Sequence, residues 1–147
     1  MIRKASAVWN GSLKEGKGTI STDSKVLSKA QYSFSTRFEN GIGTNPEELI
    51  AAAHAGCFSM ALSAQLGGAG ITPESIETTA SVTLEKVEAG FTVTKVHLDV
   101  TAKIPGADAA AFEKAAQDAK TGCPISRLLK AEITMTAKLV GGRATTA

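Results

Sequence analysis

Short runs of hydrophobic and polar residues in the first third of the chain predict β-strands, and the third run alternates with a period of two. In the third of these runs, aromatic and threonine side chains alternate with serines. Asn10 and Gly11 follow the first run and form a dipeptide that is typical of hairpin turns. Three strands are therefore expected, at residues 5–9, 17–21 and 31–38.

A helical pattern begins at residue 45. Asn45 is a good N-cap, Pro46 suits the first helical position, and Glu48 lies where a capping-box acid belongs. Apolar residues then recur every three or four positions, which predicts a long helix that continues to Leu66 and ends at the glycine pair that follows. Its apolar face is expected to comprise Leu49, Ile50, Ala53, His54, Cys57, Phe58 and Ala61.

The remaining pattern predicts two strands, two helices and a final strand. The second strand changes the parity of its apolar positions near Lys95, which indicates a β-bulge. Asp108 is expected to cap the first of these helices, and Gly122 to end it. The expected ranges are strands at 75–87, 91–104 and 131–139 and a short helix at 124–130.

This order of elements predicts a single α+β domain with an antiparallel sheet, covering residues 1–140. Residues 141–147 show no pattern and are expected to be a disordered C-terminal tail. The chain has 147 residues, enough for a core that folds unaided.

Composition narrows the possible functions. The chain is 43% hydrophobic and 20% charged, which excludes a disordered protein. No run approaches the roughly 20 apolar residues of a membrane span, and the first ten residues lack the apolar stretch of a secretion signal, so a cytoplasmic protein is expected. A formal charge of +2 with scattered lysines argues against a nucleic-acid partner.

The sequence holds two cysteines, Cys57 and Cys123, which are far apart and form no CxxC motif. Cys57 lies beyond the reach of the helix dipole, so a thiolate there needs a cation or a hydrogen-bond donor from elsewhere in the fold. Cys123 precedes Pro124 at a helix start, where free amides favour thiolate. Local electrostatics therefore make Cys123 the more acidic thiol, and the residues alone leave open which cysteine attacks first, or whether both are simply buried apolar side chains.

The segments that carry these residues resemble the OsmC/Ohr family, the osmotically inducible protein C and organic hydroperoxide resistance proteins, and in particular the OsmC branch. The resemblance extends from about residue 7 to residue 139. It implies an OsmC-like fold, in which antiparallel sheets wrap long central helices in an intertwined homodimer with two active sites at the interface. The segments are residues 36–38, 43–49, 52–62, 78–80, 87–91 and 120–126.

The resemblance also implies a thiol peroxidase that reduces organic hydroperoxides to alcohols. Cys57 then corresponds to the peroxidatic cysteine, which becomes a sulfenic acid, and Cys123 to the resolving cysteine, which forms a disulfide with it. Arg37 corresponds to the arginine that stabilises the thiolate, and Glu47 to the glutamate that holds this arginine. The implied reductant is a dithiol, a dihydrolipoyl group, and no cofactor or metal is implied. Side-chain type suggests an apolar substrate pocket of Phe38, Phe58, Met60 and Leu62.

Spacing adds a constraint of its own. Glu47 and Cys57 are ten residues apart, which is about 15 Å along an α-helix. One straight helix cannot bring both side chains to one small substrate. Either the helix bends, or the Arg37 side chain extends across the gap, or a second chain supplies part of the site.

Other interpretations compete with this one. Arg37 and the acids at the helix start have ordinary roles as surface charges and dipole partners. His54 lies one turn before Cys57, as in a Cys-His hydrolase, but no oxyanion site accompanies it, and a core or interface histidine is expected instead. A zinc site of His54, Cys57, His97 and Cys123 lacks the usual ligand pairs. The main alternative to an enzyme is a non-enzymatic, stress-protective dimer that binds a small apolar ligand.

Overall fold

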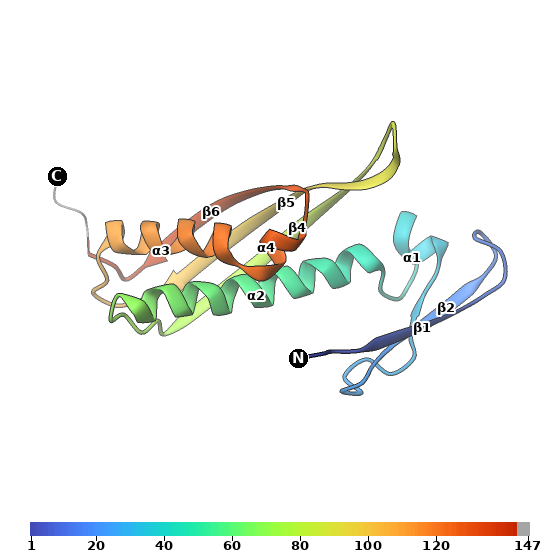
Figure 1. Ribbon diagram of the computed structural model, residues 1–147, viewed down its shortest axis with the longest axis horizontal. Coiled ribbons are helices and arrows are strands. Elements are labelled where there is room, and N and C mark those ends of the chain that lie inside the picture. The colour runs from blue at the N-terminus through green and yellow to red at the C-terminus, as the bar shows by residue number, and fades with distance from the viewer. Residues whose placement is uncertain (144–147) are drawn as a thin grey trace. The chain divides into compact units, whose positions relative to one another are not determined.

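The computed structural model describes residues 1–143, which fall into two compact units divided after Leu49. The first unit holds a three-stranded antiparallel sheet in the order β1-β2-β3, with β1 at Ala5–Asn10, β2 at Lys17–Thr22 and β3 at Ala30–Tyr32 (Figure 1). The first two strands are confirmed. Gly18 lies against the rings of Trp9 and Tyr32, whose centroids are 5.4 Å apart, and a Cβ atom there would have no room.

The third expected strand is wrong beyond Tyr32. Ser33 instead caps a short helix, α1, at Phe34–Phe38. The Ser33 hydroxyl accepts the amide of Thr36 at 3.3 Å, and the Thr36 hydroxyl accepts the amide of Ser33 at 2.8 Å. This reciprocal capping outweighs a two-residue alternation, which is too short to distinguish a strand from one helical turn.

The long helix α2 covers Pro46–Gly68, as the sequence predicts. Asn45 Oδ1 accepts the amide of Glu48 at 2.8 Å. At the other end, Ile71 donates to Leu66 and Gly70 donates to Gly67, which is the Schellman pattern. Gly70 supplies the left-handed residue that this pattern needs, with φ of +76°.

The second unit contains a three-stranded sheet in the order β4-β5-β6, with β4 at Ser75–Val87, β5 at Gly90–Lys103 and β6 at Glu132–Val140. β4 and β5 are antiparallel, but β6 runs parallel to β5, so the expectation of a wholly antiparallel sheet is corrected to a mixed one. The reason is a crossover: α3 at Ala109–Gly122 and α4 at Pro124–Leu128 carry the chain back before β6 begins.

The bulge in β5 is confirmed. Lys95 pairs with Thr83 and Val93 pairs with Leu84, so Thr94 is the extra residue. Beyond this point the even-numbered residues of β5 face the core. β6 pairs with β5 only from Lys95 onward, and the rest of the β4–β5 hairpin extends past it.

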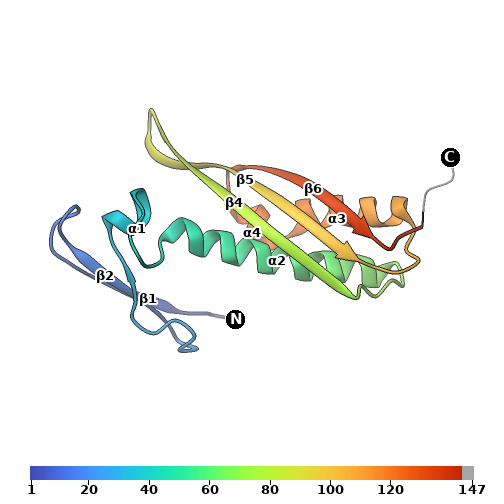
Figure 2. The same cartoon turned by 180° about the vertical axis from the view of Figure 1, so that it is seen from behind.

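The core of the second unit lies between this sheet and its helices, which cover one face of it (Figures 1 and 2). Phe58, Leu62 and Leu66 of α2 are fully buried there. Burying each such side chain contributes about 1.5–3 kcal/mol. The sheet supplies Val96, Leu98, Val100 and Ala102, and α3 supplies Phe112, Ala115, Ala116 and Ala119.

α2 is also long and apolar enough to cross a membrane by length and composition alone, which the sequence analysis did not expect. Its 18-residue window has a mean hydropathy of 1.4, although only 22% of that window is buried within the chain. Alanines contribute much of this hydropathy. One side of α2 packs on the sheet, and most of the rest of the helix is not buried within the single chain.

The expected tail is partly described. Gly141 accepts a hydrogen bond from Gly106 at 2.9 Å, and the amide of Arg143 donates to Ala107 at 2.6 Å. Residues 144–147 lie outside the described residues.

Candidate active site

The two cysteines meet in the second unit. The thiols of Cys57 on α2 and Cys123 at the α3–α4 junction are free and within hydrogen-bonding contact. Cys123 has no exposed surface, whereas Cys57 is only partly buried. Of the two sulfur atoms, Cys57 is therefore the one that a molecule from solvent reaches.

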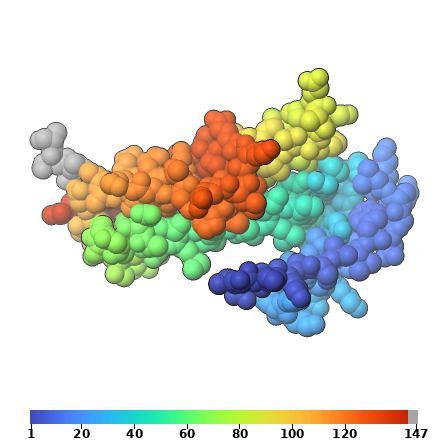
Figure 3. Space-filling model, viewed as in Figure 1, coloured from blue at the N-terminus to red at the C-terminus, as the bar shows by residue number. Residues whose placement is uncertain are grey.

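The backbone of Cys123 belongs to two helices at once. Its amide donates to Ala119 at the end of α3 at 2.9 Å, and its carbonyl accepts from Arg127 of α4 at 3.0 Å. Pro124 occupies the first turn of α4, where its missing amide costs nothing. These bonds join α3 to α4 through Cys123, and the surfaces of α3 and α4 lie next to α2 (Figure 3).

The surroundings of Cys57 favour the protonated thiol. Burial raises its pKa above the ordinary value of 9.0, and the hydrogen bond and charge interaction with Cys123 raise the pKa further. The backbone amide of Ile125, which bonds to the sulfur, lowers the pKa but does not offset the other effects. A reactive thiolate at Cys57 therefore needs additional positive charge.

Arg37 and Glu47 form an ion pair within the first unit. Nε of Arg37 donates to both carboxylate oxygens of Glu47, at 2.9 and 3.2 Å, and Nη2 donates to Oε1 at 2.6 Å. The guanidinium also lies 5.3 Å from the centre of the Phe38 ring. The Arg37 side chain remains 36% exposed against 12% for Glu47, so the arginine is held on one side and open on another.

An apolar hollow of about 280 Å³ lies beside this ion pair. Phe38, from the expected substrate pocket, lines it. The sequence analysis missed most of the other lining residues, although the Phe34 and Phe38 rings stack at 4.9 Å with the four-residue spacing of a helix. The lining residues are Trp9, Leu13, Tyr32, Ser33, Phe34, Arg37, Phe38 and Pro46.

The structure does not bring together the expected pocket set on α2. Phe58 and Leu62 are fully buried in the core and offer no surface to a substrate, whereas Met60 is 77% exposed. Helical geometry explains the separation, because residues 58 and 62 share a face and residue 60 lies about 200° around the axis from residue 58.

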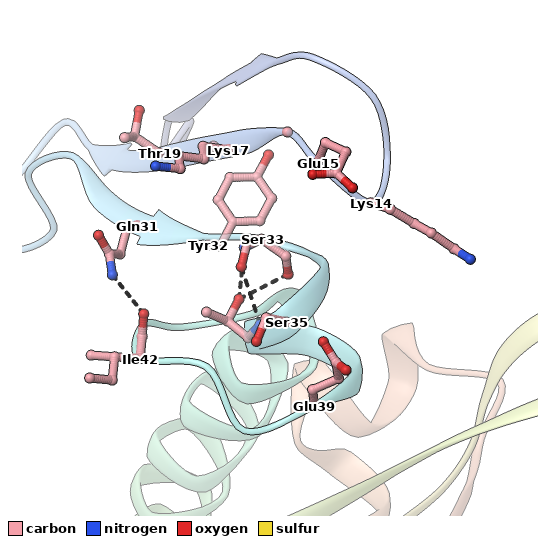
Figure 4. A pocket seen from close by; sticks show the side chains of 13 residues that line it. Lys14, Glu15, Lys17, Thr19, Gln31, Tyr32, Ser33, Ser35, Glu39 and Ile42 are labelled. Atoms are coloured by element: carbon pink, nitrogen blue, oxygen red, sulfur yellow. Dashed lines mark hydrogen bonds between the residues drawn. The ribbon is translucent and has the colours of Figure 1, made fainter.

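A second hollow in the first unit, of about 450 Å³, has a wall of both polar and apolar groups (Figure 4). Lys14, Glu15 and Glu39 contribute charges to it, and Gln31 donates to the carbonyl of Ile42 at 2.7 Å. Among the described residues that line it there is no cysteine or histidine. This hollow therefore has no group for thiol chemistry.

His54 is a core residue, as expected, but only one of its nitrogens is satisfied. Nε2 lies 2.8 Å from the hydroxyl of Ser126, whereas Nδ1 is buried with no hydrogen-bond partner among residues 1–143. Burial lowers the pKa of His54 below its ordinary value of 6.5. His97 instead bonds to Thr134 and Thr136 of β6. Within residues 1–143 no three His, Cys, Asp or Glu side chains gather in a way that could hold a metal ion.

Comparisons with known proteins identify relatives of this chain. The family model described as OsmC-like protein matches residues 38–138. The chain is 59% identical over 133 residues to Peroxiredoxin OsmC of Escherichia coli (strain K12), a match that covers 90% of this chain and 93% of that protein. It is 28% identical over 127 residues to the organic hydroperoxide resistance protein of Xanthomonas axonopodis pv. citri (strain 306), covering 86% of this chain and 87% of that one.

Solved structures show the same fold. The organic hydroperoxide resistance protein OhrB of Bacillus subtilis superposes with a TM-score of 0.65 at 25% identity, covering 92% of this chain and 97% of that one. The family model spans two thirds of the sequence, and a relative well above 30% identity matches nearly all of it. The chain therefore belongs to the OsmC-like protein family.

Proposed function

We propose that this thiol-dependent peroxidase reduces organic hydroperoxides to alcohols, with Cys57 as the attacking thiol and Cys123 as the resolving thiol. The observation that supports this proposal best is the contact between two free thiols of unequal exposure. The exposed thiol meets the substrate first, and the buried thiol is already beside it. The greater exposure of Cys57 therefore favours Cys57 as the attacking thiol, whereas the position of Cys123 at a helix start favoured Cys123.

The proposed reaction has three steps. The Cys57 thiolate attacks the terminal oxygen of the hydroperoxide, the O–O bond breaks, and the leaving alkoxide takes a proton to become the alcohol. Cys123 then attacks the sulfur of the resulting sulfenic acid, which forms a disulfide and releases water. A dithiol, a dihydrolipoyl group in our proposal, reduces this disulfide by exchange and becomes a disulfide itself.

Arg37 supplies the positive charge that Cys57 needs. In the proposal its guanidinium stabilises the thiolate and orients the peroxide, while Glu47 holds the guanidinium in place. The raised pKa of Cys57 and the open side of the Arg37–Glu47 pair support this assignment. The apolar hollow next to Arg37, with Phe38 in its wall, favours an organic substituent on the hydroperoxide.

We further propose that the chain acts as an intertwined homodimer whose two active sites lie at the interface. α2 is apolar and mostly exposed in the single chain, and Met60 is 77% exposed on it. A second copy that covers this face removes apolar surface from water. The family match crosses the boundary after Leu49, which supports one domain over residues 1–140 rather than two independent ones. The proposed compartment is the cytoplasm, where thiols are kept reduced.

The test is the consumption of cumene hydroperoxide with a dihydrolipoamide reducing system, for wild type, Cys57→Ser and Cys123→Ser. Cys57→Ser is expected to lose all activity. Cys123→Ser is expected to complete one turnover and then be inactivated, because no thiol resolves the sulfenic acid. The reverse pattern would overturn the assignment of the two cysteines.

Thiol titration separates the enzyme from the non-enzymatic dimer. Exposure of reduced wild type to hydroperoxide is expected to remove two thiols per chain without crosslinking the chains. Unchanged thiols in a folded, reduced sample would favour a ligand-binding protein.

A further inference from the structure

A second contact links the helices that carry the two cysteines. His54 on α2 and Ser126 on α4 are joined by the hydrogen bond of 2.8 Å between Nε2 and the hydroxyl oxygen. His54 is three positions before Cys57, and Ser126 is three positions after Cys123. The thiol contact and the His54–Ser126 contact are therefore one helical turn apart on each helix.

α4 is short and only partly buried. It is five residues long and contains no fully buried residue, and Ile125 is its partly buried apolar contact with the core. The sulfur of Cys57 accepts a hydrogen bond from the backbone amide of Ile125, but the proposed reaction modifies this sulfur. The bond from His54 to Ser126 does not involve that sulfur.

A histidine at position 54 lowers the stability of the fold. His54 is fully buried, and Nδ1 has no partner within residues 1–143. A buried polar atom without a partner destabilises a protein, and an apolar side chain of similar size would avoid that cost. The ring remains neutral because burial disfavours the imidazolium, so Nε2 and the hydroxyl of Ser126 bond as neutral partners.

We propose that His54 and Ser126 form a positioning pair that holds α4 on α2, so that Cys123 stays within reach of Cys57 while the sulfenic acid is converted to the disulfide. The proposal rests on the two-cysteine reaction proposed above. Addition of an oxygen to Cys57 disturbs the contact between the two thiols, and α4 must adjust without leaving α2. The pair limits this movement and shortens the lifetime of the sulfenic acid.

The experiment compares Ser126→Ala with Ser59→Ala. Ser59 is the control, because it lies on α2 near Cys57 and its hydroxyl, like that of Ser126, makes a side-chain bond of 2.8 Å, to Thr78 of β4 rather than between α2 and α4. The Ser59 hydroxyl also donates to the carbonyl of Ala55. Rapid mixing with cumene hydroperoxide gives the rate of Cys57 oxidation, and trapping with a sulfenic-acid reagent gives the rate of disulfide formation. Mass spectrometry gives the fraction of Cys57 driven to sulfinic acid by excess peroxide.

Ser126→Ala is expected to oxidise at the wild-type rate, to form the disulfide about fivefold more slowly, and to accumulate more sulfinic acid. Ser59→Ala is expected to match wild type in all three readouts. Ser126→Thr, which keeps the hydroxyl, is expected to restore disulfide formation, as is His54→Gln, whose amide nitrogen takes the place of Nε2. Equal rates of disulfide formation in wild type and Ser126→Ala would overturn the proposal.

A second readout separates this proposal from the peroxidase function. Equilibration of each variant with glutathione redox buffers measures how strongly the fold favours the Cys57–Cys123 disulfide, without any peroxide. Ser126→Ala is expected to shift this equilibrium about fivefold toward the dithiol. A shift in a protein that fails to consume hydroperoxide would support the positioning pair and overturn the peroxidase function. No shift would overturn the positioning pair alone.

Discussion

The ion pair of the first unit and the thiol pair of the second hold reactive groups in opposite ways. Arg37 is fixed by three hydrogen bonds to Glu47 and remains partly exposed. Cys57 and Cys123 are positioned by the packing of helices on a sheet, in surroundings that disfavour charge. The Arg37–Glu47 pair carries charge and is little packed, whereas the Cys57–Cys123 pair is well packed and uncharged.

The difference indicates a division of labour. A cation buried beside the thiols would lower the pKa of Cys57 permanently and leave it open to adventitious oxidation. In the proposed mechanism the charge comes from a separate element, and the thiol pair is inert without the guanidinium of Arg37. On this proposal packing governs the stability of the protein, and the ion pair governs its reactivity.

The largest expected effect is on stability, and it separates the two regions. Phe58→Ala removes a fully buried ring from the residue that follows Cys57 on α2 and is expected to lower the free energy of unfolding by about 3–5 kcal/mol. Glu47→Gln, in the partly exposed pair, is expected to lower it by at most about 1 kcal/mol. Urea unfolding followed by circular dichroism measures both, and similar losses would contradict the division.

The second effect is on reactivity. Arg37→Met is expected to slow the oxidation of Cys57 by cumene hydroperoxide about 10- to 100-fold, because the thiolate loses its cation, and to move the pH dependence of thiol alkylation to higher pH. Glu47→Gln is expected to cause a smaller loss of the same kind. Lys4, a surface cation of the same unit, provides the control Lys4→Met, which is expected to have no effect. An unchanged alkylation profile in Arg37→Met would show that the charge comes from another group.

The smallest effect tests the uncharged character of the thiol region. The folded pKa of His54 lies below the value of 6.5 that it has when unfolded. Above about pH 7 the ring is neutral in both states and pH has no effect through this group. As the pH falls through 6.5, the unfolded chain binds a proton that the folded chain does not, so stability decreases. Comparison of urea unfolding at pH 7.5 and 5.5 is expected to show a smaller decrease in His54→Gln than in wild type. An equal decrease would contradict a neutral His54.

Local signals in the sequence predicted most elements but not all of their partners. Asn45, Pro46 and the glycines after Leu66 specify the ends of α2, and the parity switch near Lys95 located the bulge. The direction of β6 was missed, because a strand pattern is the same in a parallel and an antiparallel neighbour. α1 was missed although Ser33 and Thr36 have the spacing of a capping pair, a signal that the serine alternation concealed.

The residues of the candidate site were likewise predicted only in part. The residues themselves drew attention to both cysteines, and the resemblance added Arg37 and Glu47. The structure places the members of each pair in contact. The pocket residues on α2 were chosen by side-chain type, which cannot reveal that Phe58 and Leu62 face the sheet. The bond between His54 and Ser126 joins positions too far apart in the chain for any local pattern to show.

The bulge at Thr94 has a consequence for how the length of the chain can vary. In a regular strand, loss of one residue moves every following side chain to the opposite face. Thr94 is the unpaired extra residue, and its removal would leave Val93 opposite Leu84 and Lys95 opposite Thr83, as they are now. Single-residue deletions in β5 are therefore best tolerated at this position, and homologues that differ by one residue in this hairpin can keep the same core.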